Sequence, residues 1–176
     1  MIDIIIIIVV AVIGIGIIIS VLLNNESSKT TEIENYLNKI KELGFNISKE
    51  ENKPYDYIIK NDSVTFVAKL IKIPEYSEIQ INNRTTWEIK YGAGNTVGKA
   101  QPYKKYLKEI EPFMNLDVDN SIIKIVIATP KPKKMVKYIN ECEIVFVTPQ
   151  TDVYGVKLIS LNDLTLFKEK QQDVDN

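Results

Sequence analysis

The longest uninterrupted apolar run of the chain lies near its N-terminus. Residues 4–23 read IIIIIVVAVIGIGIIISVLL, with no charge and with Ser20 as the only polar side chain. A helix rises about 1.5 Å per residue, so this run spans about 30 Å, the hydrocarbon thickness of a bilayer. No Lys or Arg precedes the run, Asp3 is negative and no A-x-A-like cleavage site is present, which favours an uncleaved anchor over a signal peptide. The pattern predicts a transmembrane helix, roughly Ile4 to Leu23.

The distribution of lysines around this run predicts its orientation. Lys29, Lys39 and Lys41 follow it closely, and no basic residue precedes it. Because positively charged flanks stay in the cytoplasm, we expect a single-pass protein of the cell membrane with its N-terminus outside and its domain cytoplasmic. The expected organisation is an anchor over residues 1–23, a linker over 24–29, a folded domain over 30–167 and a polar tail over 168–176.

Beyond the linker, the apolar spacing changes between helical and strand periods. Thr31 and Glu34 form a capping-box pattern, which begins a helix that ends near Gly44. The later spacing predicts strands over residues 55–60, 63–73, 78–81, 85–91, 121–128, 142–148 and 156–160, and helices over 102–115, 133–140 and 160–167. The strands over 121–128 and 142–148 are continuous apolar runs, typical of strands buried on both faces. The elements predict an α/β domain with helices beside a mixed sheet.

Composition narrows the chemistry that this domain can perform. The chain has 22 basic and 23 acidic residues, so a nucleic-acid site would need a local basic patch. A single cysteine, Cys142, excludes an intramolecular disulfide, and the absence of histidine excludes Ser-His-Asp catalysis, Cys-His catalysis and His-ligated metals. A metal would be held by carboxylates, which favours Mg²⁺, Mn²⁺ or Ca²⁺.

Two basic stretches and one glycine-rich loop are candidate phosphate contacts. The first stretch contains Lys99, Lys104, Lys105 and Lys108 with Tyr103 and Tyr106, and the second contains Lys131, Lys133, Lys134 and Lys137. Each stretch is either a solvated surface or a contact for phosphates or anionic lipid. The loop from Gly92 to Gly98 matches a P-loop only at Gly98-Lys99, because Ala93 and Ala100 replace the first glycine and the hydroxyl residue. A connecting loop is therefore favoured.

Several segments in order carry a resemblance to a known superfamily. They are PYDYIIKNDSVTFVAKLIKI, TTWEIKYG, AQPYKKYLKEI, IIKIVIA and IVFVTP, within residues 30 to 165. Their order and motifs resemble the restriction-endonuclease-like PD-(D/E)XK superfamily, and within it the nuclease-related domains often found beside membrane segments. The resemblance implies a restriction-endonuclease-like mixed sheet flanked by helices. It also implies a site in which two carboxylates hold a divalent metal beside a lysine.

The catalytic motif of that superfamily is incomplete in this sequence. The resemblance places its aspartate at Asp56. If Asn61-Asp62 is a two-residue turn, Asp56 lies opposite Val67, and the expected D…E-x-K becomes Asp56…Val67-x-Lys69. The lysine is present and the second carboxylate is missing. The resemblance therefore implies a degenerate catalytic site.

A second, displaced motif is the alternative. Glu88-Ile89-Lys90 is a literal E-x-K, and residues i and i+2 of a strand share a face. Glu88 would then hold a metal together with Asp56 across the sheet, and Glu34 on the first helix is a further candidate. Gln101 resembles the glutamine that opens the helix after the lysine strand in related nucleases. The simpler interpretation is that Glu88 and Lys90 form a solvated face.

Three functions follow from these patterns. The first is a membrane-anchored cytoplasmic domain that resembles a nuclease but is catalytically degenerate. It would be a binding or scaffold module for nucleic acid or a protein partner, without a small-molecule cofactor. The second is an active, Mg²⁺-dependent nuclease that uses Asp56, Glu88 and Lys90. The third is a small α/β interaction domain unrelated to nucleases, since a fold does not define a function.

Overall fold

The computed structural model describes residues 30–172 of the chain. The predicted transmembrane helix, its orientation and the linker lie outside these residues, and so does the end of the predicted tail. No helix of the described part is long and apolar enough to cross a membrane. The chain divides into two compact units, residues 1–39 and 40–176. In the first unit residues 30–39 are helical, as the capping-box pattern predicts.

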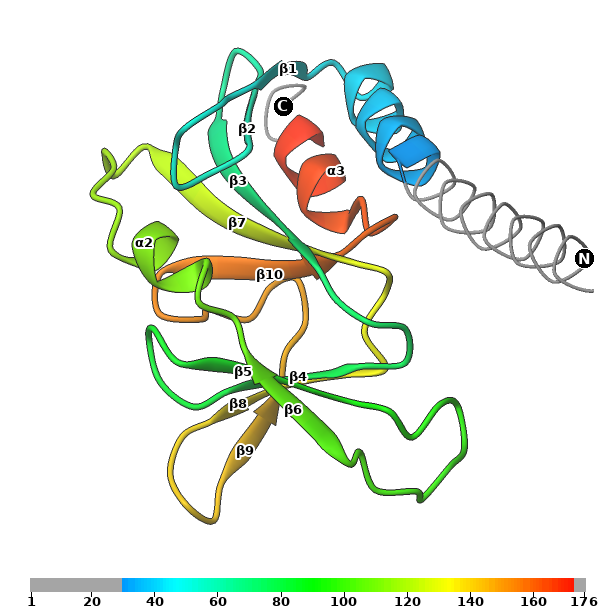
Figure 1. Ribbon diagram of the computed structural model, residues 1–176. Helices are drawn as coiled ribbons and strands as arrows, with labels where there is room; N and C mark the ends of the chain where they lie inside the picture. The colour runs from blue at the N-terminus through cyan, green and yellow to red at the C-terminus, as the bar shows by residue number, and fades with distance from the viewer. Residues whose placement is uncertain (1–29, 173–176) are drawn as a thin grey trace, which may run out of the picture. The chain divides into compact units, whose positions relative to one another are not determined.

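The second unit contains two mixed sheets of five strands each (Figure 1). Sheet A consists, in spatial order, of β1 (Asn46–Lys49), β2 (Tyr57–Lys60), β3 (Thr65–Lys72), β7 (Ile122–Thr129) and β10 (Val156–Ser160). Sheet B consists of β6 (Tyr103–Tyr106), β5 (Trp87–Tyr91), β4 (Glu78–Ile81), β8 (Lys134–Tyr138) and β9 (Ile144–Phe146). The helices are α2 (Ile110–Met114) and α3 (Thr165–Gln172).

Each sheet combines antiparallel and parallel pairing. In sheet A, β1, β2 and β3 pair antiparallel, whereas β3, β7 and β10 run parallel. In sheet B, β4, β5 and β6 pair antiparallel, β8 runs parallel to β4, and β9 returns antiparallel to β8. The parallel strands of sheet A end at the same edge of the sheet, from which α3 follows β10.

The main core lies between the two sheets. Apolar residues of both sheets form one cluster, including Val67, Ile71 and Val126 from sheet A and Trp87 and Ile89 from sheet B. The opposite face of sheet A carries three phenylalanines, Phe45, Phe66 and Phe167, whose ring centroids lie 5.2 to 6.0 Å apart. Since Phe167 belongs to α3, this helix packs on that face, and sheet A is buried on both sides.

A buried lysine holds α2 against sheet A. The Lys124 Nζ donates hydrogen bonds to the carbonyl oxygens of Phe113, Met114 and Leu116, at 3.3, 2.9 and 3.0 Å. Arg84 donates to the Met114 oxygen as well, at 3.0 Å. These donors satisfy carbonyls that have no partner inside the helix. Desolvation by burial, together with the nearby Arg84 charge, lowers the pKa of Lys124 below its usual 10.5.

The predicted α/β class with a mixed sheet is confirmed, and several strands lie where the sequence predicts them. The expected strands over residues 55–60, 63–73, 78–81, 85–91, 121–128 and 156–160 correspond to β2, β3, β4, β5, β7 and β10. The sequence missed β1. The sequence also predicted one sheet with helices on its faces, whereas the structure has two sheets. Sheet A is covered by sheet B on one face and by α3 on the other.

Two predicted helices are wrong. Residues 102–115 contain β6 and the five-residue α2, and residues 133–140 contain β8. In both segments the lysines and tyrosines suit a helix or a strand, and cross-strand pairing decides for the strand: β6 pairs with β5, and β8 pairs with β4 and β9.

Two further expectations need correction. The strand predicted over residues 142–148 is shorter and mostly exposed, because β9 is an edge strand whose residues are all exposed. Of the predicted range, Val147 is buried in the core. The last helix begins at Thr165 rather than near residue 160. Asn162, at φ 73°, lies in the left-handed region, and the Asp163 side chain accepts the Thr165 N–H at 3.0 Å, which marks the later start.

Candidate functional site

The register of β2 and β3 fixes the position of Asp56. Lys60 pairs with Thr65 and Tyr57 with Ala68, and the Asp56 N–H donates to the Ala68 oxygen at 2.9 Å. The connecting loop is therefore longer than the expected two-residue turn. Asn61 supports this loop by accepting the backbone N–H groups of Ser63 and Val64, at 3.0 and 2.9 Å.

This register corrects the predicted partner of Asp56. Asp56 lies beside Lys69, whereas Val67 lies opposite Ile58. The Asp56 Oδ1 is 3.2 Å from the Lys69 Nζ, and its Oδ2 accepts the Leu70 N–H at 2.7 Å. Both carboxylate oxygens therefore hold the β2–β3 pairing together.

The residues around Asp56 do not fit the divalent metal that the superfamily resemblance implies. Val67, at the position of the missing carboxylate, is 5% exposed and belongs to the core between the sheets. Among residues 30–172, no group of three acidic or cysteine side chains is placed to hold a metal ion.

Glu88 and Lys90 lie on a different sheet from Asp56. Trp87 and Ile89 point into the core, so the alternating side chains of Glu88 and Lys90 point away from sheet A. Asp56 instead shares with Val67 the face of sheet A that turns toward sheet B. The structure therefore does not bring Asp56 together with Glu88 and Lys90, because the backbone of sheet B lies between them.

Glu88 has its own basic partners. Its Oε1 is 3.8 Å from the Lys90 Nζ, and its Oε2 is 3.4 Å from the Lys104 Nζ. The Glu88 side chain is 6% exposed, whereas that of Lys104 is 61% exposed. The hydrogen bond with Glu88 raises the pKa of Lys104, so Lys104 is charged at neutral pH. Glu88 thus neutralises part of a lysine-rich surface.

Gln101 has a structural role in the glycine-rich loop. Its Oε1 accepts the Ala93 N–H at 2.9 Å, and its Nε2 donates to the Tyr76 oxygen at 3.2 Å. The loop connects strand β5 to strand β6, and no helix of the predicted kind follows it, which removes the context of a P-loop. Gly92, at φ 99°, leaves no room for a Cβ because the Tyr103 ring occupies that space.

The side chains of sheet B that point away from sheet A form what we call the outer face. Two cross-strand rows compose most of it. One row runs Lys104, Lys90, Glu78 and Lys134, and the other runs Tyr106, Glu88, Gln80, Val136 and Phe146. The two basic stretches of the sequence, one on β6 and one on β8, therefore contribute to one surface.

The second row has exposed aromatic ends and a buried middle. Tyr106 is 48% exposed and Phe146 is 63% exposed. A lysine lies over each ring: the Lys104 Nζ is 5.7 Å from the Tyr106 centroid, and the Lys134 Nζ is 5.3 Å from that of Phe146. The ends are four strand spacings apart, about 19 Å. Each end of the row therefore offers an exposed aromatic ring beside a positive charge.

Gln80 is the unusual residue of the row. It lies on the central strand β4 and is only 9% exposed. Its amide has no hydrogen-bond partner among residues 30–172. In this range every fully enclosed polar side-chain atom has a partner, so the Gln80 amide is not fully enclosed. The amide therefore keeps access to the surface, and it is free to accept and donate hydrogen bonds to a ligand.

The sequence did not indicate this face, because two of its strands were expected to be helices. The available signal was a strand-like period of two over residues 103–107, in which Lys104 and Tyr106 alternate with Tyr103, Lys105 and Leu107. Comparison with known proteins does not add to the assignment: no family model, curated protein or solved structure matches the chain.

Proposed function

We propose that this chain is a nuclease-like binding module rather than a working nuclease. A helix followed by antiparallel strands and then a parallel strand supports the resemblance to PD-(D/E)XK proteins. The adjacency of Asp56 and Lys69 supports the placement of the motif. The lack of a second carboxylate at Val67 favours binding over catalysis, because one carboxylate holds a divalent ion weakly. The anchor predicted over residues 4–23 would hold the module at the cytoplasmic side of the cell membrane.

We further propose that the outer face of sheet B binds single-stranded nucleic acid. The observation that carries this proposal is the row from Tyr106 to Phe146, with its exposed rings and the unpartnered amide of Gln80 between them. Proteins that bind single strands combine stacking aromatic side chains with lysines along the backbone path. This row and its neighbouring lysines offer both.

Each part of the face has a distinct role in this proposal. Unpaired bases stack on Tyr106 and Phe146, and the Gln80 amide binds the edge of a base. Lys90, Lys104 and Lys134 lie in the adjoining row and contact phosphates. A duplex keeps its bases stacked inside the helix, where the two rings cannot reach them. Single strands are therefore preferred.

The test is binding of the full chain, solubilised in detergent, to a fluorescent oligonucleotide of about 12 nucleotides. We expect binding of the single strand to exceed that of the matching duplex, and to weaken as salt rises. Phe146→Ala and Tyr106→Ala should each weaken binding by about 1–3 kcal/mol. Tyr154→Ala is the matched control, because Tyr154 is also exposed and lies under a lysine but belongs to neither row.

Gln80→Met is a sharper test because it separates binding from folding. Methionine has a similar length and no polar atoms, and the Gln80 amide makes no hydrogen bond within the described chain. The melting temperature should stay the same or rise, while affinity for the single strand falls. If this variant and both aromatic variants bind the single strand as tightly as the unmodified chain does, the outer face is not the binding site. Preference for anionic lipid vesicles over oligonucleotides would assign it to a membrane surface instead.

A further inference from the structure

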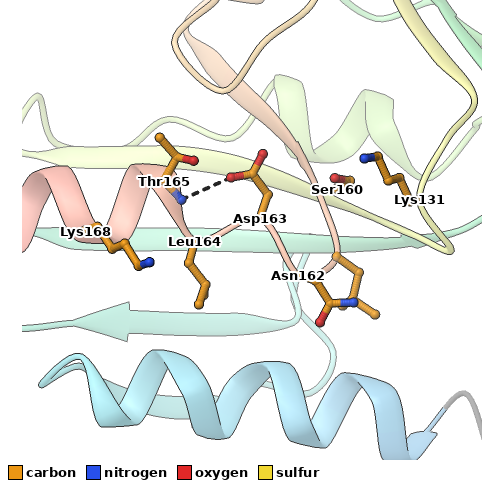
Figure 2. Close-up of a pocket in the computed structure, with 8 residues that line it drawn as sticks. Lys131, Ser160, Asn162, Asp163, Leu164, Thr165 and Lys168 are labelled. Atoms are coloured by element: carbon orange, nitrogen blue, oxygen red, sulfur yellow. Dashed lines mark hydrogen bonds between the residues drawn. The ribbon is translucent and has the colours of Figure 1, made fainter.

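A pocket opens at the edge of sheet A, and none of the residues that line it belongs to the two rows of the outer face. Strands β7 and β10 run parallel and end there at Thr129 and Ser160. The pocket has a volume of about 500 Å³, and Figure 2 shows it between the start of α3 and the segment that follows β7. Ligands of parallel sheets bind in such crevices at the carboxyl ends of the strands.

Ser160 is a buried polar residue of this pocket. It is 7% exposed and lines the pocket. Its hydroxyl has no hydrogen-bond partner in the part of the chain that the structure describes. All fully enclosed polar side-chain atoms of that part have one, so the Ser160 Oγ is not fully enclosed, and the pocket is a space that Ser160 lines. A buried hydroxyl in this situation requires a hydrogen-bonding ligand or water.

Two lysines give the pocket a positive character. Lys131 follows β7 and Lys168 lies on α3, and both line the pocket. In Figure 2 they lie on opposite sides, and their ammonium ends turn toward the space between them. Neither ammonium forms an ion pair or hydrogen bond with another residue between 30 and 172. An anion in this space would attract both charges.

The first turn of α3 adds further donors and one acceptor. The N-terminus of a helix carries partial positive charge and N–H groups without intrahelical partners. Asp163 satisfies one of them by accepting the Thr165 N–H at 3.0 Å. The Asp163 carboxylate also lines the pocket, where it can accept a hydrogen bond from a hydroxyl group. The recognised molecule would thus carry an anionic group and a hydroxyl.

We propose that this pocket binds a small phosphorylated sugar or nucleotide. The phosphate lies between Lys131, Lys168 and the Ser160 hydroxyl, and a sugar hydroxyl donates to Asp163. The remaining body of the ligand contacts Leu164, which also lines the pocket. A volume of about 500 Å³ is larger than a free phosphate requires and lies in the range of small-molecule sites. The site is separate from the outer face of sheet B, so it stands independently of nucleic-acid binding.

The test is isothermal titration calorimetry of the full chain in detergent with four probes. They are adenosine monophosphate, ribose 5-phosphate, adenosine and inorganic phosphate. We expect adenosine monophosphate or ribose 5-phosphate to bind, adenosine not to bind, and inorganic phosphate to bind at least tenfold more weakly than the better of the first two. Absence of binding by both phosphorylated probes at millimolar concentrations would overturn the proposal. Equal binding of adenosine and its phosphate would do so as well.

Variants locate the binding. Lys131→Met, Lys168→Met and Ser160→Ala should each weaken binding of the phosphorylated probe by about tenfold, the loss expected for one hydrogen bond to a charged group. Lys60→Met is the matched control, because Lys60 is an exposed lysine of the same sheet at the end of the antiparallel strand β2. Melting temperatures of all four variants verify that each is folded.

A crossed measurement distinguishes the pocket from the outer face. Phe146→Ala should leave binding of the phosphorylated probe unchanged, and Ser160→Ala should leave oligonucleotide binding unchanged. Loss of probe binding in Phe146→Ala with full binding in Ser160→Ala would show that the phosphate binds sheet B, and the pocket would be rejected. Loss in Ser160→Ala alone supports the pocket whether or not the chain binds nucleic acid.

Discussion

Sheets A and B have the same number of strands, and each contains a carboxylate that lies beside a lysine. The surroundings of the two carboxylates differ. Asp56 of sheet A uses both oxygens within the sheet, on Lys69 and on the Leu70 N–H. Glu88 of sheet B lies on an outer face, between Lys90 and the exposed Lys104. In sheet A the charges support the fold. In sheet B they form part of a surface that can receive a ligand.

The covering of the two sheets explains this difference. Sheet A has the main core on one side and the phenylalanine cluster with α3 on the other. Sheet B packs its inner face against sheet A, and its outer face keeps exposed rings at Tyr106 and Phe146. Polar groups between packed layers must satisfy one another, whereas those on a free face can keep unused hydrogen-bonding capacity, as Gln80 does.

The largest expected difference between the sheets is the cost of removing a phenylalanine. Phe66 on β3 is fully buried between Phe45 and Phe167, so Phe66→Ala should lower the free energy of unfolding by about 3–5 kcal/mol. Phe146 on β9 is 63% exposed, so Phe146→Ala should change it by less than about 0.5 kcal/mol. Urea denaturation of both variants measures this. Similar losses would mean that the outer face is a core.

The next largest effect concerns the buried lysine of β7. Lys124→Met removes three hydrogen bonds to the carbonyls that end and follow α2 and should cost about 2 kcal/mol. Lys134→Met on the outer face should cost less than about 0.5 kcal/mol. Lys134 is partly exposed, and within the described part of the chain its ammonium makes a cation–π contact with Phe146 but no ion pair or hydrogen bond. Chemical denaturation compares the pair. A stabilised Lys124→Met would mean that desolvation of this ammonium outweighs its hydrogen bonds.

Asp56 provides a smaller effect and a test of metal binding. Asp56→Ala removes a partly buried ion pair and a hydrogen bond to the backbone, and should cost about 1 kcal/mol. We expect Mn²⁺ to leave the melting temperature of the unmodified chain unchanged, and no cleavage of DNA or RNA with Mg²⁺ or Mn²⁺. Glu88→Gln serves as the comparison. Cleavage that this variant abolishes would assign a working site to Glu88 and Lys90.

The smallest effect is a pH dependence at the start of β7. Hydrogen bonds from the Ser121 N–H and hydroxyl lower the pKa of Asp119 below 3.8. A depressed pKa in the folded state stabilises the fold above the unfolded pKa, and this contribution disappears as pH falls through the folded pKa. Asp119→Ala should therefore melt slightly lower than the unmodified chain at pH 7. The gap should close in acid below pH 3.8, and a gap that persists there would exclude this carboxylate as its cause.

The sequence determined those parts of the molecule in which local pattern and burial agree. The continuous apolar run of β7 identified a central strand, and the segments of β4 and β5 were predicted almost to the residue. The sequence also predicted that Asp56 and Lys69 lie close together. It placed Asp56 opposite Val67, however, because it assumed a shorter loop between β2 and β3. Asn61 caused this difference, because its side chain supports a longer loop than the pair Asn61-Asp62 suggested.

Only the tertiary structure decided where the polar residues gather. Tyr103 to Tyr106 and Lys134 to Tyr138 have no strong preference for helix or strand, and pairing with β5 and β4 made them strands of one sheet. That pairing brought Lys104 to Glu88 and left the Gln80 amide without a hydrogen-bond partner among the described residues. In the same way, the parallel alignment of β7 and β10 brought Lys131 and Ser160 to one pocket. Local periodicity fixes which face a side chain points to. Long-range pairing fixes its neighbours, which no spacing along a single chain encodes.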